Sequence, residues 1–137
     1  MEENNERILS ELEEHVGKRD HLWVLGDWCF DPTLVERFAK IRCARKSLVR
    51  GNHDVFHMSV YSEVFHDVYG LVRYKGMWLS HPPIHPDELR GKPNLHGHVH
   101  YQSINDPRYF NCCPENLWPK YGRCLVNLNE LRQHFSL

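Results

Sequence analysis

Four short apolar runs along this chain each end in Asp, Asn or His residues. They lie at positions 22–27, 47–54, 76–81 and 93–100. A brief hydrophobic run bounded by turn residues is typical of a buried strand, and the loops that leave the carboxyl ends of strands in an open α/β sheet form its binding crevice. The pattern therefore predicts an α/β fold in which four loops rich in polar side chains meet.

Helical patterns alternate with these runs. We expect a first helix of about a dozen residues that begins at Asn4 or Asn5 and stops at Gly17, because Asn is a favoured N-cap and Gly a favoured helix stop. A second helix is expected to begin at Asp31, with Pro32 in its first turn. The apolar stripes that these helices would bury are Ile8, Leu9, Leu12 and Val16 in the first and Leu34, Val35, Phe38 and Ile41 in the second.

The segments after residue 54 predict further short elements, whose limits are set by proline and glycine. In chain order these are a short helix or irregular segment at 55–66, a hairpin of strands 68–74 and 77–80 turning at Lys75-Gly76, an extended proline-rich loop after His81, strands at 108–113 and 123–126, and a last short helix from Asn127 to near Phe135. The chain shows no repeat, low-complexity tract or linker, so residues 1–137 are expected to form one domain.

Composition and charge narrow the class of protein. The formal net charge is −1 over 137 residues, which gives no broad electrostatic track for nucleic acid. No stretch is long and apolar enough to cross a bilayer, and the acidic first residues are the reverse of a signal sequence. The five cysteines form no Cys-x-x-Cys pair, which argues against a disulfide framework and a structural zinc knuckle. We therefore expect a cytoplasmic protein with reduced thiols and no membrane partner.

The ends of the four runs supply residues suited to divalent metal and phosphate. They are Asp27, Asn52, His53, Asp54, His81, His98 and His100. A carboxylate such as Asp27 can bridge two ions, while neutral imidazoles and an amide oxygen complete the ligands of each ion without adding charge. Two ions about 3.5–4 Å apart hold a hydroxide between them and neutralise a phosphoryl group during in-line attack. The predicted reaction is therefore hydrolysis of a phosphate ester by a metal-bound hydroxide.

Neighbouring residues of this set are expected to have different roles. Asn52 can direct its carbonyl oxygen at a metal while His53 faces the substrate as a charged partner or general acid, with Asp54 orienting the imidazole. If the segment 96–100 is extended, His98 and His100 point the same way and both reach the metals. His96 would lie on the same face of the extended segment as His98 and His100, but further back along the strand. Whether it contacts a metal is left open. Each cluster taken alone is typical of a turn. The prediction of a metal site therefore depends on the four clusters occurring together, each after its own apolar run.

These motifs resemble those of the calcineurin-like metallophosphoesterase family, whose pattern is D-x-H, G-D, G-N-H-[DE], a lone histidine and G-H-x-H. The last four motifs stand here as Gly26-Asp27, Gly51-Asn52-His53-Asp54, His81 and Gly97-His98-Val99-His100. The match is specific over residues 21–100, and the stretches 109–113 and 123–131 resemble the closing strands and last helix of small bacterial and phage members.

The resemblance implies a four-layer α/β/β/α sandwich around a dinuclear metal centre. The implied metal ligands are Asp27 as the bridge between the ions, Asn52, His81 and His98 on one ion, and His100 on the other. By resemblance, His53 contacts the phosphate and the leaving group, with Asp54 beside it. The implied cofactor is one or two divalent ions of Mn, Fe, Zn or Mg. The implied activity is that of a phosphatase or phosphodiesterase on a small phosphate ester, with nucleotides among the candidate substrates.

The first family motif has no counterpart, because no Asp-x-His occurs before Asp27. In the family this motif ends the first strand and supplies two ligands of one metal, so we expect the first strand to be missing and the fold to be shortened at its N-terminus. Three explanations stay open. The chain is a fragment or has a misassigned start, it is a natural short form that holds one metal well and the other poorly, or a partner chain or a second copy in a homodimer supplies the strand.

Two other functions also stay open. The missing motif favours a catalytically weak binding module of the same fold family, as the retromer scaffold subunit is, or one half of a complex; the intact histidines favour retained chemistry. A nuclease is supported by the basic residues Arg42, Arg45, Lys46 and Arg50. Such a cluster near a helix end is typical of a solvated surface, so nucleic acid is the less favoured partner.

Overall fold

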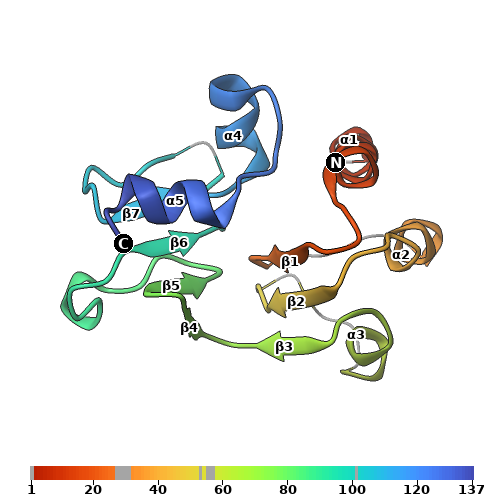
Figure 1. Ribbon diagram of the computed structural model, residues 1–137, viewed down its shortest axis with the longest axis horizontal. Helices are drawn as coiled ribbons and strands as arrows, with labels where there is room; N and C mark the ends of the chain where they lie inside the picture. The colour runs from red at the N-terminus through yellow and green to blue at the C-terminus, as the bar shows by residue number, and fades with distance from the viewer. Residues whose placement is uncertain (1, 27–31, 53, 55–57, 101) are drawn as a thin grey trace.

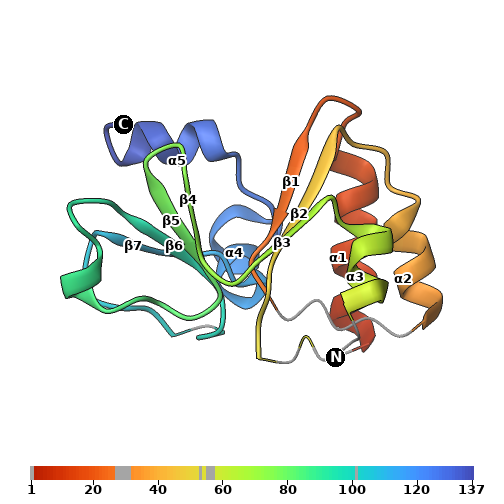
Figure 2. The same cartoon turned by 90° about the horizontal axis from the view of Figure 1, so that it is seen from below.

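The computed structural model describes residues 2–26, 32–52, 54, 58–100 and 102–137 of the chain. These residues form a mixed α/β fold with two β-sheets (Figures 1 and 2). The helices are α1 (Glu2–His15), α2 (Pro32–Ala39), α3 (Met58–Val64), α4 (Pro114–Tyr121) and α5 (Leu128–His134), with a 3-10 turn at Pro86–Glu88. The strands are β1 (His21–Val24), β2 (Arg45–Val49), β3 (Asp67–Tyr69), β4 (Val72–Tyr74), β5 (Met77–Ser80), β6 (Asn94–His96) and β7 (Tyr109–Asn111). Within the described ranges, every helix falls short of the length and apolar character that a bilayer crossing requires.

The first sheet has the strand order β1-β2-β3, and its strands run parallel. Figure 2 shows α1, α2 and α3 together on one face of this sheet. The central strand β2 is buried on both faces, because successive side chains of a strand point to opposite sides. Leu48 belongs to the core under the helices and Val49 to the core on the other face. The strand predicted at 47–49 is therefore present and begins two residues earlier.

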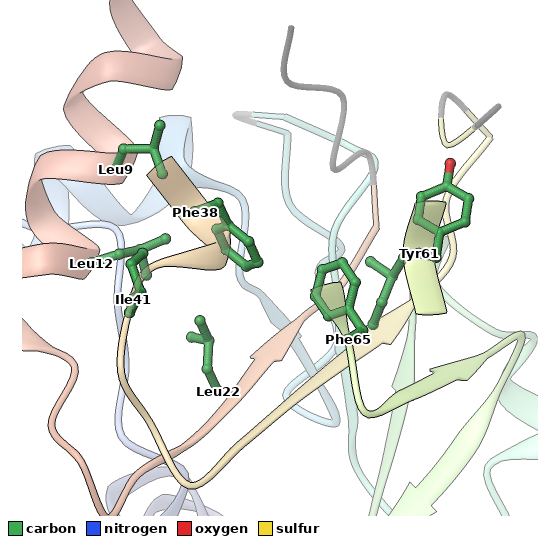
Figure 3. Packing of buried hydrophobic residues seen from close by; sticks show 8 residues of the cluster. Leu9, Leu12, Leu22, Phe38, Ile41, Tyr61 and Phe65 are labelled. Carbon is green, nitrogen blue, oxygen red and sulfur yellow. The ribbon is translucent and has the colours of Figure 1, made fainter. Parts of the chain in front are cut away.

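The first core lies between this sheet and its helices (Figure 3). The rings of Phe38 in α2 and Phe65 after α3 pack at a centroid distance of 5.4 Å, and Tyr61 of α3 is fully buried. The apolar stripe predicted for the first helix contributes Leu9 and Leu12. Burial of a large apolar side chain stabilises a fold by about 1.5–3 kcal/mol, so these contacts fix the helices on the sheet.

The second sheet has the strand order β4-β5-β6-β7, with β4 antiparallel to β5 and the other pairs parallel. Its buried side chains include Met77, Leu79 and Leu95, which pack in one cluster with Leu131 of α5. Val49 of the first sheet belongs to the same cluster. The two sheets therefore share a core, and Figure 1 shows α4 and α5 on the side of the second sheet.

The chain crosses from the first sheet to the second at residues 70–71, which corrects the single strand predicted at 68–74. Here β3 pairs with β2, whereas β4 pairs with β5. A run of apolar residues cannot reveal such a switch, because both halves bury side chains in a sheet. The predicted hairpin between β4 and β5 is confirmed, and its turn residues Lys75 and Gly76 both have positive φ.

The C-terminal region departs further from the sequence prediction. Residues 123–126, predicted as a strand, lie outside the strands of the described chain; Cys124 N donates to Glu11 Oε1 of α1 at 2.8 Å. The stretch before them, for which no helix or strand was predicted, forms α4, which has a proline in its first turn and Gly122 as C-cap with φ +75°. The last helix is confirmed, and Asn127 caps it by accepting a hydrogen bond from the backbone N two residues ahead at 2.8 Å.

Candidate functional site

The loops that follow β1, β2, β5 and β6 converge on His81. Nδ1 of His81 lies 3.0 Å from the carbonyl oxygen of Leu25, which follows β1. Gly97 N, just after β6, donates to the carbonyl oxygen of His81 at 2.8 Å. Asn52, in the loop after β2, places Oδ1 2.8 Å from His81 Nε2. His81 itself is only 3% exposed, so the four loops enclose its ring.

His98 completes a cluster of three side chains. Its Nδ1 lies 3.0 Å from His81 Nε2, the same nitrogen that Asn52 Oδ1 faces. The carbonyl oxygen of Leu25 can only accept, so His81 Nδ1 carries a proton and donates to it. In the neutral ring, His81 Nε2 then presents a lone pair toward Asn52 Oδ1, which is also an acceptor. Two acceptors at this distance repel each other unless a proton or a cation lies between them.

The cluster has the atoms and the spacing of a divalent cation site. Imidazole nitrogens and amide oxygens are ligands of Zn, Mn and Fe. With metal–ligand bonds of about 2.1 Å, neighbouring ligand atoms lie about 3.0 Å apart at the right angles of six-coordinate ions such as Mn and Mg. In a tetrahedral zinc site they lie about 3.4 Å apart. His81 is buried, whereas Asn52 and His98 are exposed, which leaves the cluster open to solvent on one side. These three side chains could therefore hold one ion that a solvent-borne ligand can reach.

Other parts of the predicted site are not in this cluster. The described residues contain no group of three or more His, Cys, Asp or Glu side chains that could hold an ion; the cluster above consists of two imidazoles and an amide. Asp27 and His53 lie outside the described residues. The bridging role of Asp27 and the substrate contact of His53 stay predictions.

Two glycines make room for the His81 ring. A Cβ at Gly26, which has φ +94°, would lie 2.2 Å from His81 Nδ1. A Cβ at Gly97 would lie 2.9 Å from the carbonyl oxygen of Leu25 and 3.6 Å from His81 Nδ1. Both glycines directly precede predicted ligands. A side chain at Gly26 would overlap the imidazole, and one at Gly97 would overlap the carbonyl oxygen of Leu25.

The segment 97–100 coils instead of extending, which corrects the predicted alignment of His98 and His100. The two residues have φ of +71° and +55°, a conformation that costs about 1–2 kcal/mol for a residue with a Cβ. The structure brings His98 to His81, whereas His100 Nδ1 lies 2.5 Å from Glu115 Oε2 of α4. The expectation that His98 and His100 point the same way depended on an extended backbone, and the segment is not extended.

His96 packs in the core of the second sheet. It is 1% exposed, its Nδ1 lies 2.9 Å from the carbonyl oxygen of Gly97, and its ring meets that of Tyr109 edge-on at 6.1 Å. Burial lowers the pKa of His96, although the hydrogen bond to Gly97 opposes the shift. These contacts give His96 a structural role beneath the cluster.

Asp54 is bound within its own loop. Its side chain is 2% exposed, and Oδ2 accepts a hydrogen bond from Gly51 N at 2.7 Å. Its carbonyl oxygen accepts from Arg50 Nε at 2.8 Å. These bonds shape the turn that presents Asn52, while the predicted orientation of His53 by Asp54 involves a residue outside the described part of the chain.

Glu115 is a residue near the site that the sequence prediction missed. It lies in the first turn of α4, and its side chain is 34% exposed where it meets His100. A proline followed by an acidic residue is typical of a helix start, so Pro114-Glu115 carried a signal for α4. No pattern in the sequence linked that helix to the histidine motif.

The cysteines that the structure describes include two with a strongly raised pKa. Burial raises the pKa of the Cys112 thiol and of the Cys124 thiol to about 12. Catalysis by cysteine requires the thiolate. At neutral pH these two residues are therefore protonated and unsuited to act as nucleophiles.

Three of the four basic residues that supported a nuclease have hydrogen-bond partners within the protein. Arg45 donates two hydrogen bonds to Asp67, at 2.6 and 2.7 Å. Lys46 is 6% exposed, and its Nζ donates to two carbonyl oxygens at the end of α2. Arg50 Nε donates to a carbonyl oxygen of its own loop. Each of these three side chains therefore has a structural partner, while Arg45 and Arg50 stay at the surface.

Comparisons of the chain with protein-family models, with curated proteins and with solved structures find no significant match. The function is therefore argued from the motifs and from the geometry of the cluster.

Proposed function

We propose that this chain is a calcineurin-like metallophosphoesterase that hydrolyses a small phosphomonoester or phosphodiester. In this proposal the two sheets are the central layers of a four-layer α/β/β/α sandwich, with α1 to α3 outside one sheet and α4 and α5 outside the other. Support comes from the core that both sheets share and from the separate core under α1 to α3.

The observation that carries the proposal is the meeting of Asn52 Oδ1, His81 Nε2 and His98 Nδ1. Their loops are far apart in the sequence, yet the atoms lie 2.8 and 3.0 Å apart. Asn52 Oδ1 and His98 Nδ1 both face the same nitrogen of His81, which carries no proton in the neutral ring. A divalent cation would be a common partner for both atoms.

In the proposed site these three side chains hold one ion of Mn, Fe, Zn or Mg. Asp27 and His100 would supply the further ligands of the metal centre. A divalent ion bound there supplies Lewis acidity and lowers the pKa of a water molecule. The residues of the chain complete the chemistry: His53 contacts the phosphate and the leaving group, and Asp54 orients its ring.

Metal-dependent hydrolysis of p-nitrophenyl phosphate and bis(p-nitrophenyl) phosphate tests this proposal. The protein is stripped with a chelator and then assayed with Mn²⁺, Zn²⁺, Fe²⁺ and Mg²⁺ separately. Asn52→Ala and His98→Ala each remove an exposed side chain of the cluster, so folding should persist. We expect each substitution to reduce activity by about 100-fold. The loss of a residue that only supports a metal ligand already costs about 10–100-fold, and the loss of a ligand should cost at least as much. His85→Ala, a change at a histidine whose side chain is 69% exposed, should leave activity unchanged.

Absence of turnover with every metal, in protein shown to be folded, would contradict the hydrolase. The absence of Asp-x-His before Asp27 favours one second candidate, a binding module of the same fold. The number of Zn²⁺ ions bound per chain, measured by calorimetry, separates the two functions. Two ions, with activity lost in His53→Ala, would favour the enzyme, whereas one ion or none would favour the module. A steep loss of nucleic-acid affinity with salt would instead support the nuclease.

A further inference from the structure

His100 is held from two sides by the region around α4. Its Nδ1 lies 2.5 Å from Glu115 Oε2. Its carbonyl oxygen accepts a hydrogen bond from Asn111 Nδ2 at 2.8 Å. The residue has φ +55°, which is unfavourable for residues other than glycine. Contacts to both its ring and its backbone therefore stabilise a conformation that the chain would otherwise avoid.

Asn111 links this loop to the start of α4. It is 6% exposed, and its Nδ2 donates to the carbonyl oxygens of both His100 and Gln102 at 2.8 Å. Its Oδ1 accepts from Cys113 N at 2.8 Å, and its own carbonyl oxygen accepts from Asn116 Nδ2 at 2.9 Å. The helix that carries Glu115 and the loop that carries His100 are thus joined through one buried amide.

We infer that Glu115 is a positioning residue that fixes the tautomer and the orientation of His100. A carboxylate accepts only, so His100 Nδ1 carries the proton and Nε2 keeps the lone pair. Histidines that bind metals commonly donate their other ring N–H to a carboxylate in this way. The role of His100 toward a cation rests on the proposed function, whereas the fixed tautomer can be observed without any metal.

A purely structural role for Glu115 is the competing explanation, because an acidic residue in the first turn stabilises a helix. Glu130 provides the matched control, since it lies in the first turn of α5. Glu115→Ala and Glu130→Ala each remove an acidic side chain from a first turn. Only Glu115→Ala removes the contact with His100.

The first experiment follows the tautomer by ¹⁵N NMR of the metal-free protein at mildly alkaline pH. His100→Ala identifies the signals of His100. We expect the Nδ1-protonated form in the wild type and in Glu130→Ala, a mixture of tautomers in Glu115→Ala, and partial recovery in Glu115→Gln, whose amide oxygen still accepts. An unchanged His100 spectrum in Glu115→Ala would overturn the inference, even if the protein proved to be an active hydrolase.

The second experiment measures the affinity for Zn²⁺ by calorimetry in the wild type and in the variants Glu115→Ala, Glu115→Gln and Glu130→Ala. We expect Glu115→Ala to weaken binding by about 10–100-fold, Glu115→Gln to lie between it and the wild type, and Glu130→Ala to match the wild type. Equal losses in the two alanine variants would show a helix effect and refute the positioning role. If the wild type bound no ion, the proposed function would fail, and the NMR result would still decide whether Glu115 sets the ring of His100.

Discussion

At the scale of single residues, the space around His81 decides what the neighbouring loops can be. Gly26 must adopt φ +94°, and the ring of His81 occupies the place of its missing side chain. Gly97 approaches the carbonyl oxygen of Leu25 from the other side. The glycine before Asp27 is therefore explained by packing against the His81 ring, and the glycine before His98 by packing against the carbonyl oxygen of Leu25, independently of any ligand.

Gly26→Ala should destabilise the protein more than an alanine at another glycine of positive φ. Gly91 has φ +80° and no heavy atom within 4 Å of an added Cβ, so Gly91→Ala isolates the backbone strain, which we expect to cost about 1 kcal/mol. Gly26→Ala adds the overlap with His81 and should cost about 3 kcal/mol in all. Urea unfolding measures both, and equal losses would show that the ring moves aside freely.

The left-handed backbone of His100 gives a second prediction. His100→Gly and His100→Ala both remove the contact with Glu115, so their difference reports the conformation alone. Because φ is +55°, the glycine variant should be more stable than the alanine variant by about 1 kcal/mol in urea unfolding. The exposed helical residue Glu14 is the control, where glycine should be less stable than alanine by about 1 kcal/mol. The same sign at both positions would refute the prediction.

At the scale of elements, apolar runs that end in polar clusters predicted strands correctly where each run belongs to one sheet. β1, β2, β5 and β6 were predicted in this way, and the side chains of Asn52 and His98, which follow β2 and β6, meet that of His81, which follows β5. The split of 68–74 into β3 and β4 could not be predicted, since hydrophobic periodicity reports burial and not the sheet that provides it. The contact of Glu115 with His100 was hidden for a related reason, because it joins a helix to a loop through the tertiary fold.

A network of hydrogen-bonded side chains connects the strands of the first sheet at the end opposite the His81 cluster. His21 Nε2 lies 2.7 Å from Ser47 Oγ, and Ser47 Oγ donates to Asp67 Oδ2 at 3.0 Å. Arg45 also donates to Asp67. Burial lowers the pKa of His21, and the nearby positive charge of Arg45 lowers it further. The neutral ring therefore suits this connection of β1, β2 and β3.

This shift in pKa makes stability depend on pH in a defined direction. As the pH falls below about 6.5, the unfolded chain protonates His21 before the folded protein does, so the free energy of unfolding decreases until the folded protein protonates as well. His21→Gln should make this decrease shallower, by at most about 1.4 kcal/mol per pH unit. Urea unfolding from about pH 5 to 8 measures the slope. His15→Gln, at a more exposed histidine of α1, is the control, and equal slopes in all three proteins would contradict the assignment.

At the scale of the whole molecule, Glu11 of α1 connects the N-terminal helix with the region after β7. Its carboxylate accepts from Trp118 Nε1 of α4 at 2.6 Å and from Cys124 N at 2.8 Å. Arg7 lies 3.4 Å from the same carboxylate and 4.2 Å from the centre of the Trp118 ring. The helices of the first sheet are thereby bound to the helices of the second by polar contacts, in addition to the core that the sheets share.

Removing this carboxylate should weaken the whole fold. Glu11→Ala leaves the indole N–H of Trp118 and the N–H of Cys124 without their acceptor, and we expect a loss of about 2–3 kcal/mol in the free energy of unfolding. Glu11→Gln keeps one acceptor oxygen and should fall between this variant and the wild type. Glu14→Ala, at a side chain that is 74% exposed on the same helix, should change stability by less than about 0.5 kcal/mol. Hydrogen exchange at residues 123–126 should accelerate in Glu11→Ala alone; unchanged exchange there would show that other contacts hold this segment against α1.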